Sequence, residues 1–244
     1  MTPGSTAHEI TAWLLPTAGL DDAMIAAWRP LLDAGEQARA DRFVFDRHRR
    51  TFVAAHALLR LRLAEACGVA PAALRFEPGA HGKPTAWIGG TPAPLSFHLS
   101  HTEGLVGLAV TPVAGCALGF DVEALDRRVT LDVADRYFRP EEVAWLHGLP
   151  AAAQAEGFLR LWTLKEAFIK ATGDGLACDL ASFWFEPLLP RVHFTPALPE
   201  RAEAWWFGQR LAGGFVAAVG LRAAGSPVSV HWRELDPTGR AAFR

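Results

Sequence analysis

The stretch Gly119-Phe120-Asp121-Val122-Glu123 continues a predicted strand over residues 117–122. Because side chains alternate along a strand, Asp121 and Glu123 share one face, and the apolar residues share the other. Two such carboxylates repel each other by roughly 4 kcal/mol at ~4 Å and an effective dielectric of about 20. A hard cation such as Mg²⁺ turns this cost into a binding site. An amphipathic edge strand with a solvated acidic face is the alternative interpretation.

A second stretch, Leu161-Trp162-Thr163-Leu164-Lys165-Glu166-Ala167-Phe168-Ile169-Lys170, lies in a predicted helix over residues 154–172. At 100° per residue its apolar side chains form one stripe, with Lys165 near the middle. A buried ammonium must either reach solvent or meet an anion, because leaving it unpaired is costly. Glu166 and Lys170 are four residues apart and flank the stripe on the same side. A snorkelling lysine beside a surface Glu–Lys pair is the other interpretation.

The patterns along the chain predict an α+β protein in two similar halves, residues 1–112 and 113–244, each with helices followed by strands. Besides residues 154–172, helices are predicted at residues 21–32, 51–66 and 133–146. Besides residues 117–122, strands are predicted at residues 10–15, 95–99, 105–110, 182–185, 204–207, 215–221 and 228–232.

Composition excludes several classes of protein. The 244 residues are 50% hydrophobic and 20% charged, with a net charge of −2, which argues against a general nucleic-acid or membrane-surface binder. No signal peptide and no apolar run of spanning length is recognisable. The three cysteines lie far apart with no C-x-x-C pair, so we expect neither structural zinc nor disulfides, and a reduced, cytoplasmic location.

Arginines are concentrated in one segment of the first half, where only Asp41 and Asp46 oppose them. They are Arg39, Arg42, Arg47, Arg49, Arg50, Arg60 and Arg62. This cationic patch suits a phosphorylated ligand or an acidic protein surface. A solvated basic helix face is the alternative, and nucleic acid is not supported by the overall charge.

Ser100 and His101 follow the predicted strand over residues 95–99, and Lys83 lies upstream in a predicted turn. These side chains can donate hydrogen bonds to phosphate oxygens. A serine–histidine hydrolase is the competing interpretation. Adjacent residues on a strand point to opposite faces, however, and the chain has no G-x-S-x-G turn. A structural histidine is a further alternative.

Taken together and in this order, the motifs resemble those of the 4′-phosphopantetheinyl transferases of the surfactin-synthetase-activating, or Sfp-like, type. A G-x-D-x-E strand and a later W-[ST]-x-K-E-[AS]-x-x-K helix mark that family, and residues 119–123 and 162–170 match both without departure. Gly82-Lys83-Pro84 and Ser100-His101 match the family's G-K-P turn and S-H pair. The resemblance covers roughly residues 36–232.

The resemblance implies a pseudo-twofold α+β fold with coenzyme A in a cleft between the two halves. It implies transfer of the 4′-phosphopantetheine arm to a serine of an acyl or peptidyl carrier protein, with 3′,5′-ADP as the leaving group. The metal would be Mg²⁺, with Mn²⁺ as a substitute, on Asp121, Glu123 and Glu166. Glu166 would also be the base, and Lys165 and Lys170 would contact phosphate and the leaving group.

Further coenzyme A contacts implied by the resemblance are Lys83, Ser100 and His101, with Arg42 and Arg50, and less firmly Arg39, at the 3′-phosphate. Glu142 or its neighbour Glu141 would be a further acidic residue near the metal. The resemblance implies a cytoplasmic monomer and leaves the pathway open. A Mg²⁺-dependent phosphohydrolase and a non-catalytic module that binds coenzyme A or a carrier protein remain the alternative functions.

Overall fold

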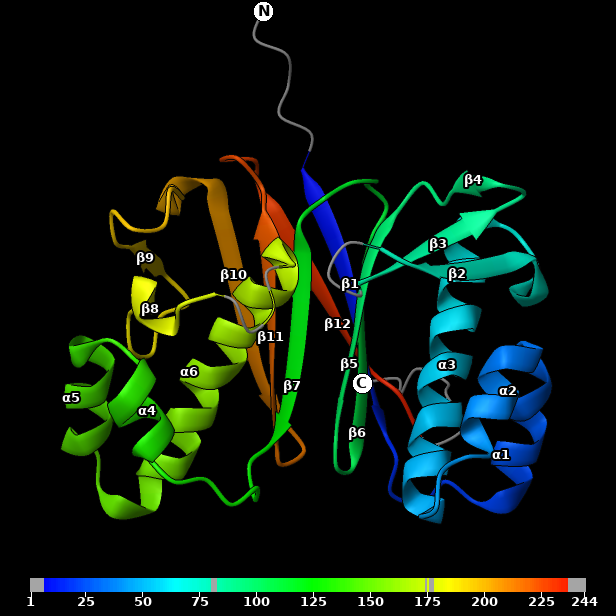
Figure 1. Ribbon diagram of the computed structural model, residues 1–244, viewed down its shortest axis with the longest axis horizontal. Helices are drawn as coiled ribbons and strands as arrows, with labels where there is room; N and C mark the ends of the chain where they lie inside the picture. Colours follow the sequence, from blue (N-terminus) through cyan, green and yellow to red (C-terminus); the bar gives the residue numbers. More distant parts are fainter. Residues whose placement is uncertain (1–6, 80–82, 174, 176–177, 237–244) are drawn as a thin grey trace, which may run out of the picture. The chain divides into compact units, whose positions relative to one another are not determined.

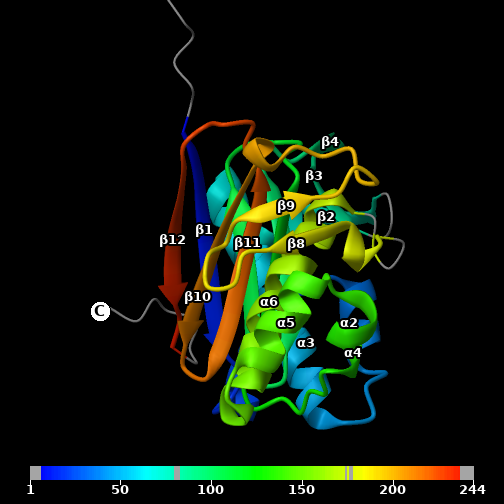
Figure 2. The same cartoon turned by 90° about the vertical axis from the view of Figure 1, so that its left-hand side faces the viewer.

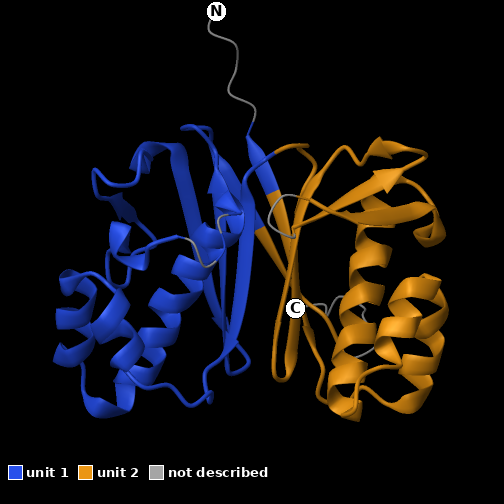
Figure 3. Ribbon diagram, in the orientation of Figure 1, with its two compact units in different colours: residues 1–9, 116–230 blue, residues 10–115, 231–244 orange. Residues whose placement is uncertain are grey.

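The computed structural model describes residues 7–79, 83–173, 175 and 178–236, and it is a mixed α+β structure (Figure 1). The chain divides into two compact units (Figure 3). We call Ile10–Gly115 with His231–Arg244 the N-terminal unit, and Cys116–Val230 with Met1–Glu9 the C-terminal unit. This division differs from a single cut after residue 112, because the last strand pairs with the first.

The N-terminal unit contains most of a four-stranded sheet in the order β12-β1-β6-β5, and all of a smaller sheet in the order β2-β3-β4. The division between the units falls within β1 and β12. The long helix α3 packs on β6 through buried side chains such as Leu59, Leu63 and Val106. The elements are β1 (His8–Pro16), α1 (Asp22–Trp28), α2 (Ala34–Ala40), α3 (Asp46–Cys67), β2 (Leu74–Pro78), β3 (Pro84–Ile88), β4 (Thr91–Pro92), β5 (Ser96–Thr102), β6 (Leu105–Thr111) and β12 (Val228–Glu234).

The C-terminal unit contains a sheet in the order β10-β11-β7, with α6 packed against β7 and β11. Helix α5 lies beside α6 on the side away from this sheet, as the two views in Figures 1 and 2 agree. The elements are β7 (Leu118–Ala124), α4 (Asp132–Tyr137), α5 (Pro140–Gly148), α6 (Ala151–Thr172), β8 (Phe183–Phe185), β9 (Val192–Phe194), β10 (Trp205–Ala212) and β11 (Phe215–Arg222).

Prolines interrupt two of the predicted helices. Residues 133–146 form two helices, α4 and α5, because Pro140 begins the second and Arg139 before it is extended, with φ −71° and ψ 147°. Residues 21–32 form α1 followed by a short 3₁₀ turn, Arg29–Leu31, that contains Pro30. Helix α2 and strands β2, β3, β4 and β9 were not predicted, since their patterns are short.

No helix among the described residues is long and apolar enough to cross a bilayer.

A buried arginine holds the helices of the N-terminal unit together. Arg60 of α3 is 0% exposed, and its guanidinium contacts Glu36 at 2.7 Å and Asp33 at 2.6 Å. It also donates to the carbonyls of Pro71 and Leu74, at 3.1 and 3.2 Å. Glu36 and Asp33 form the capping box of α2. One cation therefore ties α2, α3 and the start of β2 together, and its charge is fully paired.

We expect acid to weaken the N-terminal unit through Glu36. Burial alone would raise the pKa of this carboxyl, but hydrogen bonds from His56, Arg60 and the Asp33 N–H lower it to about 2. A depressed carboxyl pKa stabilises the fold above the unfolded value, and that stability is lost between about pH 4.5 and pH 2. The contribution is about 3 kcal/mol. As the pH falls through this range, the urea midpoint should therefore drop more steeply for the unaltered chain than for Glu36→Gln. Midpoints that fall in parallel for the two proteins would contradict this.

Candidate active site

Strand β7 places its acidic residues on the face that helix α6 covers. Gly119, Asp121 and Glu123 alternate with apolar residues and therefore share one face. A Cβ on Gly119 would lie 1.9 Å from the Ala167 carbonyl oxygen and 2.5 Å from the Ala171 nitrogen, both in α6. The helix backbone therefore rests directly on this glycine, and Asp121 and Glu123 follow along the same face as buried carboxylates.

The close approach at Gly119 predicts a strong effect of one methyl group. In Gly119→Ala, α6 must move away from β7, since both obstructing atoms belong to the helix backbone and neither can rotate aside. Overpacking of this kind typically costs 1–3 kcal/mol, and we expect about 3 kcal/mol here. Gly148→Ala is the matched control, because its Cβ would meet nothing within 4 Å. Urea denaturation of both variants measures the difference, and a Gly119→Ala midpoint equal to that of the control would show that α6 can shift at no cost.

Two cations offset the acidic face. The Lys170 Nζ of α6 lies 2.6 Å from Asp121 Oδ1, and Arg127 forms a close ion pair with Glu123. Burial raises the pKa of Glu166; the Lys170 charge opposes this rise, and the charges of Asp121 and Glu123 add to it. The three carboxylates therefore interact electrostatically across the contact between β7 and α6.

Among the residues that the structure describes, no three acidic, histidine or cysteine side chains stand close enough together to hold a metal ion as they lie. Lys170 and Arg127 instead neutralise carboxylates of the acidic face in this arrangement. The metal role of Asp121, Glu123 and Glu166 therefore stays a prediction.

Lys165 meets its anion inside the protein. It is 0% exposed, and its Nζ lies 2.9 Å from Glu142 Oε2, with the Leu180 and Phe183 carbonyls at 3.0 and 2.8 Å. The ammonium also sits over the rings of Phe138 and Phe183 at 4.7 and 4.5 Å. The sequence pattern correctly placed this lysine in a buried stripe. In this structure, however, it contacts a carboxylate of the chain rather than occupying a surface position for phosphate.

Comparison with known proteins identifies the family. Residues 117–219 match the model of the 4′-phosphopantetheinyl transferase superfamily, and this segment contains both β7 and α6. The 4′-phosphopantetheinyl transferase HetI of a Nostoc species is 37% identical over 172 residues, which cover 69% of this chain and 70% of the relative. A 4′-phosphopantetheinyl transferase of Bacillus subtilis is 32% identical over 167 residues, with 68% and 70% covered. The chain belongs to the 4′-phosphopantetheinyl transferase superfamily. It is an enzyme of this transferase class.

The transferase uses the same anchoring arrangement in both of its units. Helices α3 and α6 each have 22 residues and end at a left-handed glycine, Gly68 and Gly173. Arg60 and Lys165 each lie eight residues before that glycine and bind a glutamate that is the third residue of the preceding helix. Each also binds the carbonyl of the first residue of the next strand. Lys165 is thus the counterpart of a structural arginine.

The correspondence between the two units does not extend to the acidic site. The residue after Lys165 is Glu166, whereas the residue after Arg60 is Leu61, which is partly exposed. The transferase therefore has one acidic site of this kind on its long helices, in the C-terminal unit. Two charged residues of this unit could not be assigned from the sequence. The family resemblance did not distinguish Glu142 from its exposed neighbour Glu141, and the spacing of four residues between Arg127 and Glu123 was the one sign of a pairing between these two.

The predicted coenzyme A contacts outside the motif helix and strand all lie in the N-terminal unit. Arg50 is held by Asp22, Asp46 and the Leu20 carbonyl, whereas Arg42 donates to the Ala38 carbonyl from an exposed position. Ser100 and His101 lie on β5, buried and exposed respectively, and burial lowers the pKa of Lys83. Gly82, which precedes Lys83 in the predicted G-K-P turn, lies outside the described residues. The roles of these side chains remain predictions.

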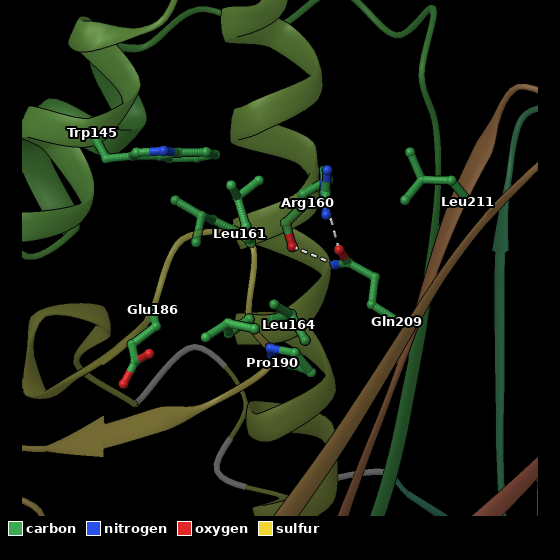
Figure 4. Close-up of a pocket in the computed structure, with 10 residues that line it drawn as sticks. Trp145, Arg160, Leu161, Leu164, Glu186, Pro190, Gln209 and Leu211 are labelled. Carbon is green, nitrogen blue, oxygen red and sulfur yellow. Dashed lines mark hydrogen bonds between the residues drawn. The ribbon is translucent and has the colours of Figure 1, made fainter.

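A cavity of about 120 Å³ lies elsewhere in the C-terminal unit (Figure 4). Trp145 of α5, Leu161 and Leu164 of α6, and Pro190 form its apolar walls, with Gln209 of β10 at one side. None of the predicted site residues lines it. From helical geometry its residues on α6 lie well round the helix from Glu166, so this cavity is separate from the acidic site.

Proposed function

We propose that this transferase moves the 4′-phosphopantetheine arm of coenzyme A onto a serine hydroxyl of an acyl or peptidyl carrier protein. The serine oxygen attacks the phosphorus that bears the pantetheine arm, and 3′,5′-ADP leaves with the electron pair of the broken pyrophosphate bond. The observations that carry the proposal are the Lys170–Asp121 ion pair and the electrostatic interaction of Glu166 with Asp121 and Glu123 where β7 meets α6, in a chain of this family.

We propose Asp121, Glu123 and Glu166 as the residues that hold Mg²⁺, with Mn²⁺ as a substitute. Their donor atoms are all carboxylate oxygens, which a hard cation prefers, and their mutual repulsion is the cost that a dication removes. Once bound, the ion would offset negative charge on the pyrophosphate oxygens. Lys170 supplies a second positive charge beside Asp121, and charge neutralisation of this kind provides most of the rate in phosphoryl transfer.

Glu166 is the proposed general base that accepts the proton of the carrier serine. Burial, together with the charges of Asp121 and Glu123, raises its pKa, which makes it a stronger proton acceptor than an exposed glutamate. The nucleophile belongs to the carrier, so none of the three cysteines needs to react, and burial raises the pKa of both Cys67 and Cys116.

Intact-protein mass spectrometry tests this function. The enzyme, coenzyme A, Mg²⁺ and an apo carrier protein should give a carrier heavier by one phosphopantetheinyl group, with one 3′,5′-ADP released for each carrier modified. Release of 3′,5′-ADP without any carrier would instead indicate a phosphohydrolase. Tight coenzyme A binding with no product from a panel of acyl and peptidyl carriers would indicate a binding module.

A further inference from the structure

Two adjacent apolar side chains are exposed where α2 passes into α3. Residues 41–45 form this connection, which we call the α2–α3 corner. Within it Val44 is 90% exposed and Phe45 is 56% exposed. Burial of an apolar side chain of this size is worth about 1.5–3 kcal/mol, so leaving both in water forgoes stability that a partner could supply.

Helix α3 begins at this corner without a side-chain N-cap. Phe45 is the N-cap residue of α3 and makes no capping hydrogen bond, whereas Asp21 and Asp33 cap α1 and α2 through their side chains. Helices α4 and α6 also begin without a side-chain cap, at Leu131 and Pro150, so the exposed ring rather than the missing cap distinguishes this corner. Serine, threonine, aspartate or asparagine is preferred at an N-cap. A position that breaks a local folding rule while exposing an aromatic ring is expected where function determines the residue.

Neighbouring side chains hold the corner in one shape. The Arg47 guanidinium lies 5.1 Å from the centre of the Phe45 ring, and the His48 ring meets Phe45 edge-on at 5.7 Å. Phe43 packs on Phe52 of α3 at 5.3 Å. The exposed ring is therefore pre-organised, which lowers the entropy cost of binding a partner.

The charge around the corner is positive. Residues 39–50 contain five arginines and two aspartates, a net charge of +3. Asp41 is bound to Arg29, and Asp46 to Arg49 and Arg50. Arg39 and Arg47 form no ion pair with an acidic side chain of the described residues; they lie instead over the rings of Phe52 and Phe45. A partner that complements this surface carries carboxylates beside apolar residues.

We propose that the α2–α3 corner is the surface that docks the carrier protein, with Val44 and Phe45 entering the apolar stripe of an acidic amphipathic helix. This inference rests on the proposed function, which supplies the partner. Arg47, which lies beside Phe45, meets a carboxylate that flanks the stripe, and the apolar pair provides the anchor. The exposed leucines beside the cavity, Leu188 and Leu189, are the competing surface, but their turn is electrically balanced because Glu186 pairs with Arg191 at 3.3 Å.

Phe45→Ser separates docking from folding, because serine removes the anchor and restores a capping residue. We expect the KM for carrier to rise at least tenfold, the KM for coenzyme A to stay within twofold, and the urea midpoint to stay the same or rise. Arg47→Gln should weaken the salt dependence of the KM for carrier. Leu189→Ser is the matched control, since this side chain is 51% exposed, and it should leave both KM values unchanged.

An unchanged KM for carrier in Phe45→Ser, with transfer intact in the unaltered enzyme, would overturn the docking surface while leaving the proposed function in place. If the KM for carrier rises in Leu189→Ser and not in Phe45→Ser, the carrier docks on the C-terminal unit, and this too would overturn the proposed docking surface. If the unaltered enzyme transfers nothing, the proposed function fails on its own. Anisotropy of a fluorescent apo carrier then decides the docking question, since a tenfold weaker Kd in Phe45→Ser supports the surface and an equal Kd refutes it.

Discussion

Glu166→Gln should abolish nearly all transfer and leave the protein at least as stable as the unaltered chain. The amide cannot accept the serine proton and is a weaker oxygen donor for a metal ion. General-base catalysis alone is worth 10²–10⁴-fold, so we expect turnover to fall by about a thousandfold. Stability should hold or rise, because Glu166 is one of three carboxylates whose charges oppose one another.

Initial rates and urea denaturation on the same preparation measure both effects of Glu166→Gln. Glu156→Gln is the matched control, since Glu156 is an exposed residue of the same helix whose one ion pair among the described residues is with Arg160, at 3.8 Å. The control should retain its turnover. Near-normal transfer by Glu166→Gln would remove this residue from the proposed chemistry. A large loss of stability would instead show that its carboxylate supports the fold.

Glu142→Gln should strongly destabilise the C-terminal unit. Burial raises the pKa of Glu142 and lowers that of Lys165, so the environment opposes both charges, and their mutual attraction offsets this cost. Removing one partner leaves the other buried charge uncompensated, which costs about 3–5 kcal/mol. The glutamine amide has one acceptor oxygen, whereas the carboxylate accepts from the Phe185 N–H through one oxygen and meets Lys165 and the Arg139 N–H through the other, so at least one buried donor also loses its acceptor. Chemical denaturation measures the loss, and a variant within 1 kcal/mol of the unaltered chain would contradict it.

The double variant Glu142→Leu with Lys165→Met distinguishes a structural lysine from a catalytic one. Replacing both charges with apolar side chains of similar volume is often neutral, so most of the stability should return. If Lys165 acts only through packing, transfer returns with stability. If it contacts a phosphate as the family resemblance implies, transfer stays low while the urea midpoint recovers. The structural counterpart Arg60 favours the first outcome.

In the acidic site, the sequence predicts which residues share a strand face, but it does not predict which distant residues they contact. Alternation along β7 correctly placed Asp121 and Glu123 on one face, because that relation involves only neighbouring residues. The partner of Asp121 is Lys170, 49 residues away, and that contact depends on how closely α6 approaches the sheet. Gly119 permits this approach, yet a glycine in a sequence does not indicate which backbone will rest on it.

The helices and strands, too, were predicted where a local pattern is long enough to be recognised. The long, periodic helices were predicted, although α3 begins at Asp46 rather than near residue 51, since residues 46–50 are mostly charged and exposed. Short elements such as β4 and β9 gave no periodic signal. The C-terminal strand β12 was predicted as a strand, but its place beside β1 follows from sheet pairing and not from its own residues.

The sequence by itself determined the family, the α+β class, and which acidic and basic side chains share a strand face or a helix side, because these depend on motif order and on backbone periodicity. Only the tertiary structure decided that Lys165 meets Glu142, that Arg127 and Lys170 neutralise the acidic face, and that Phe45 stands exposed. The physical reason is that the partner and the solvent exposure of a side chain are set by distant segments packed against it, which local spacing does not specify.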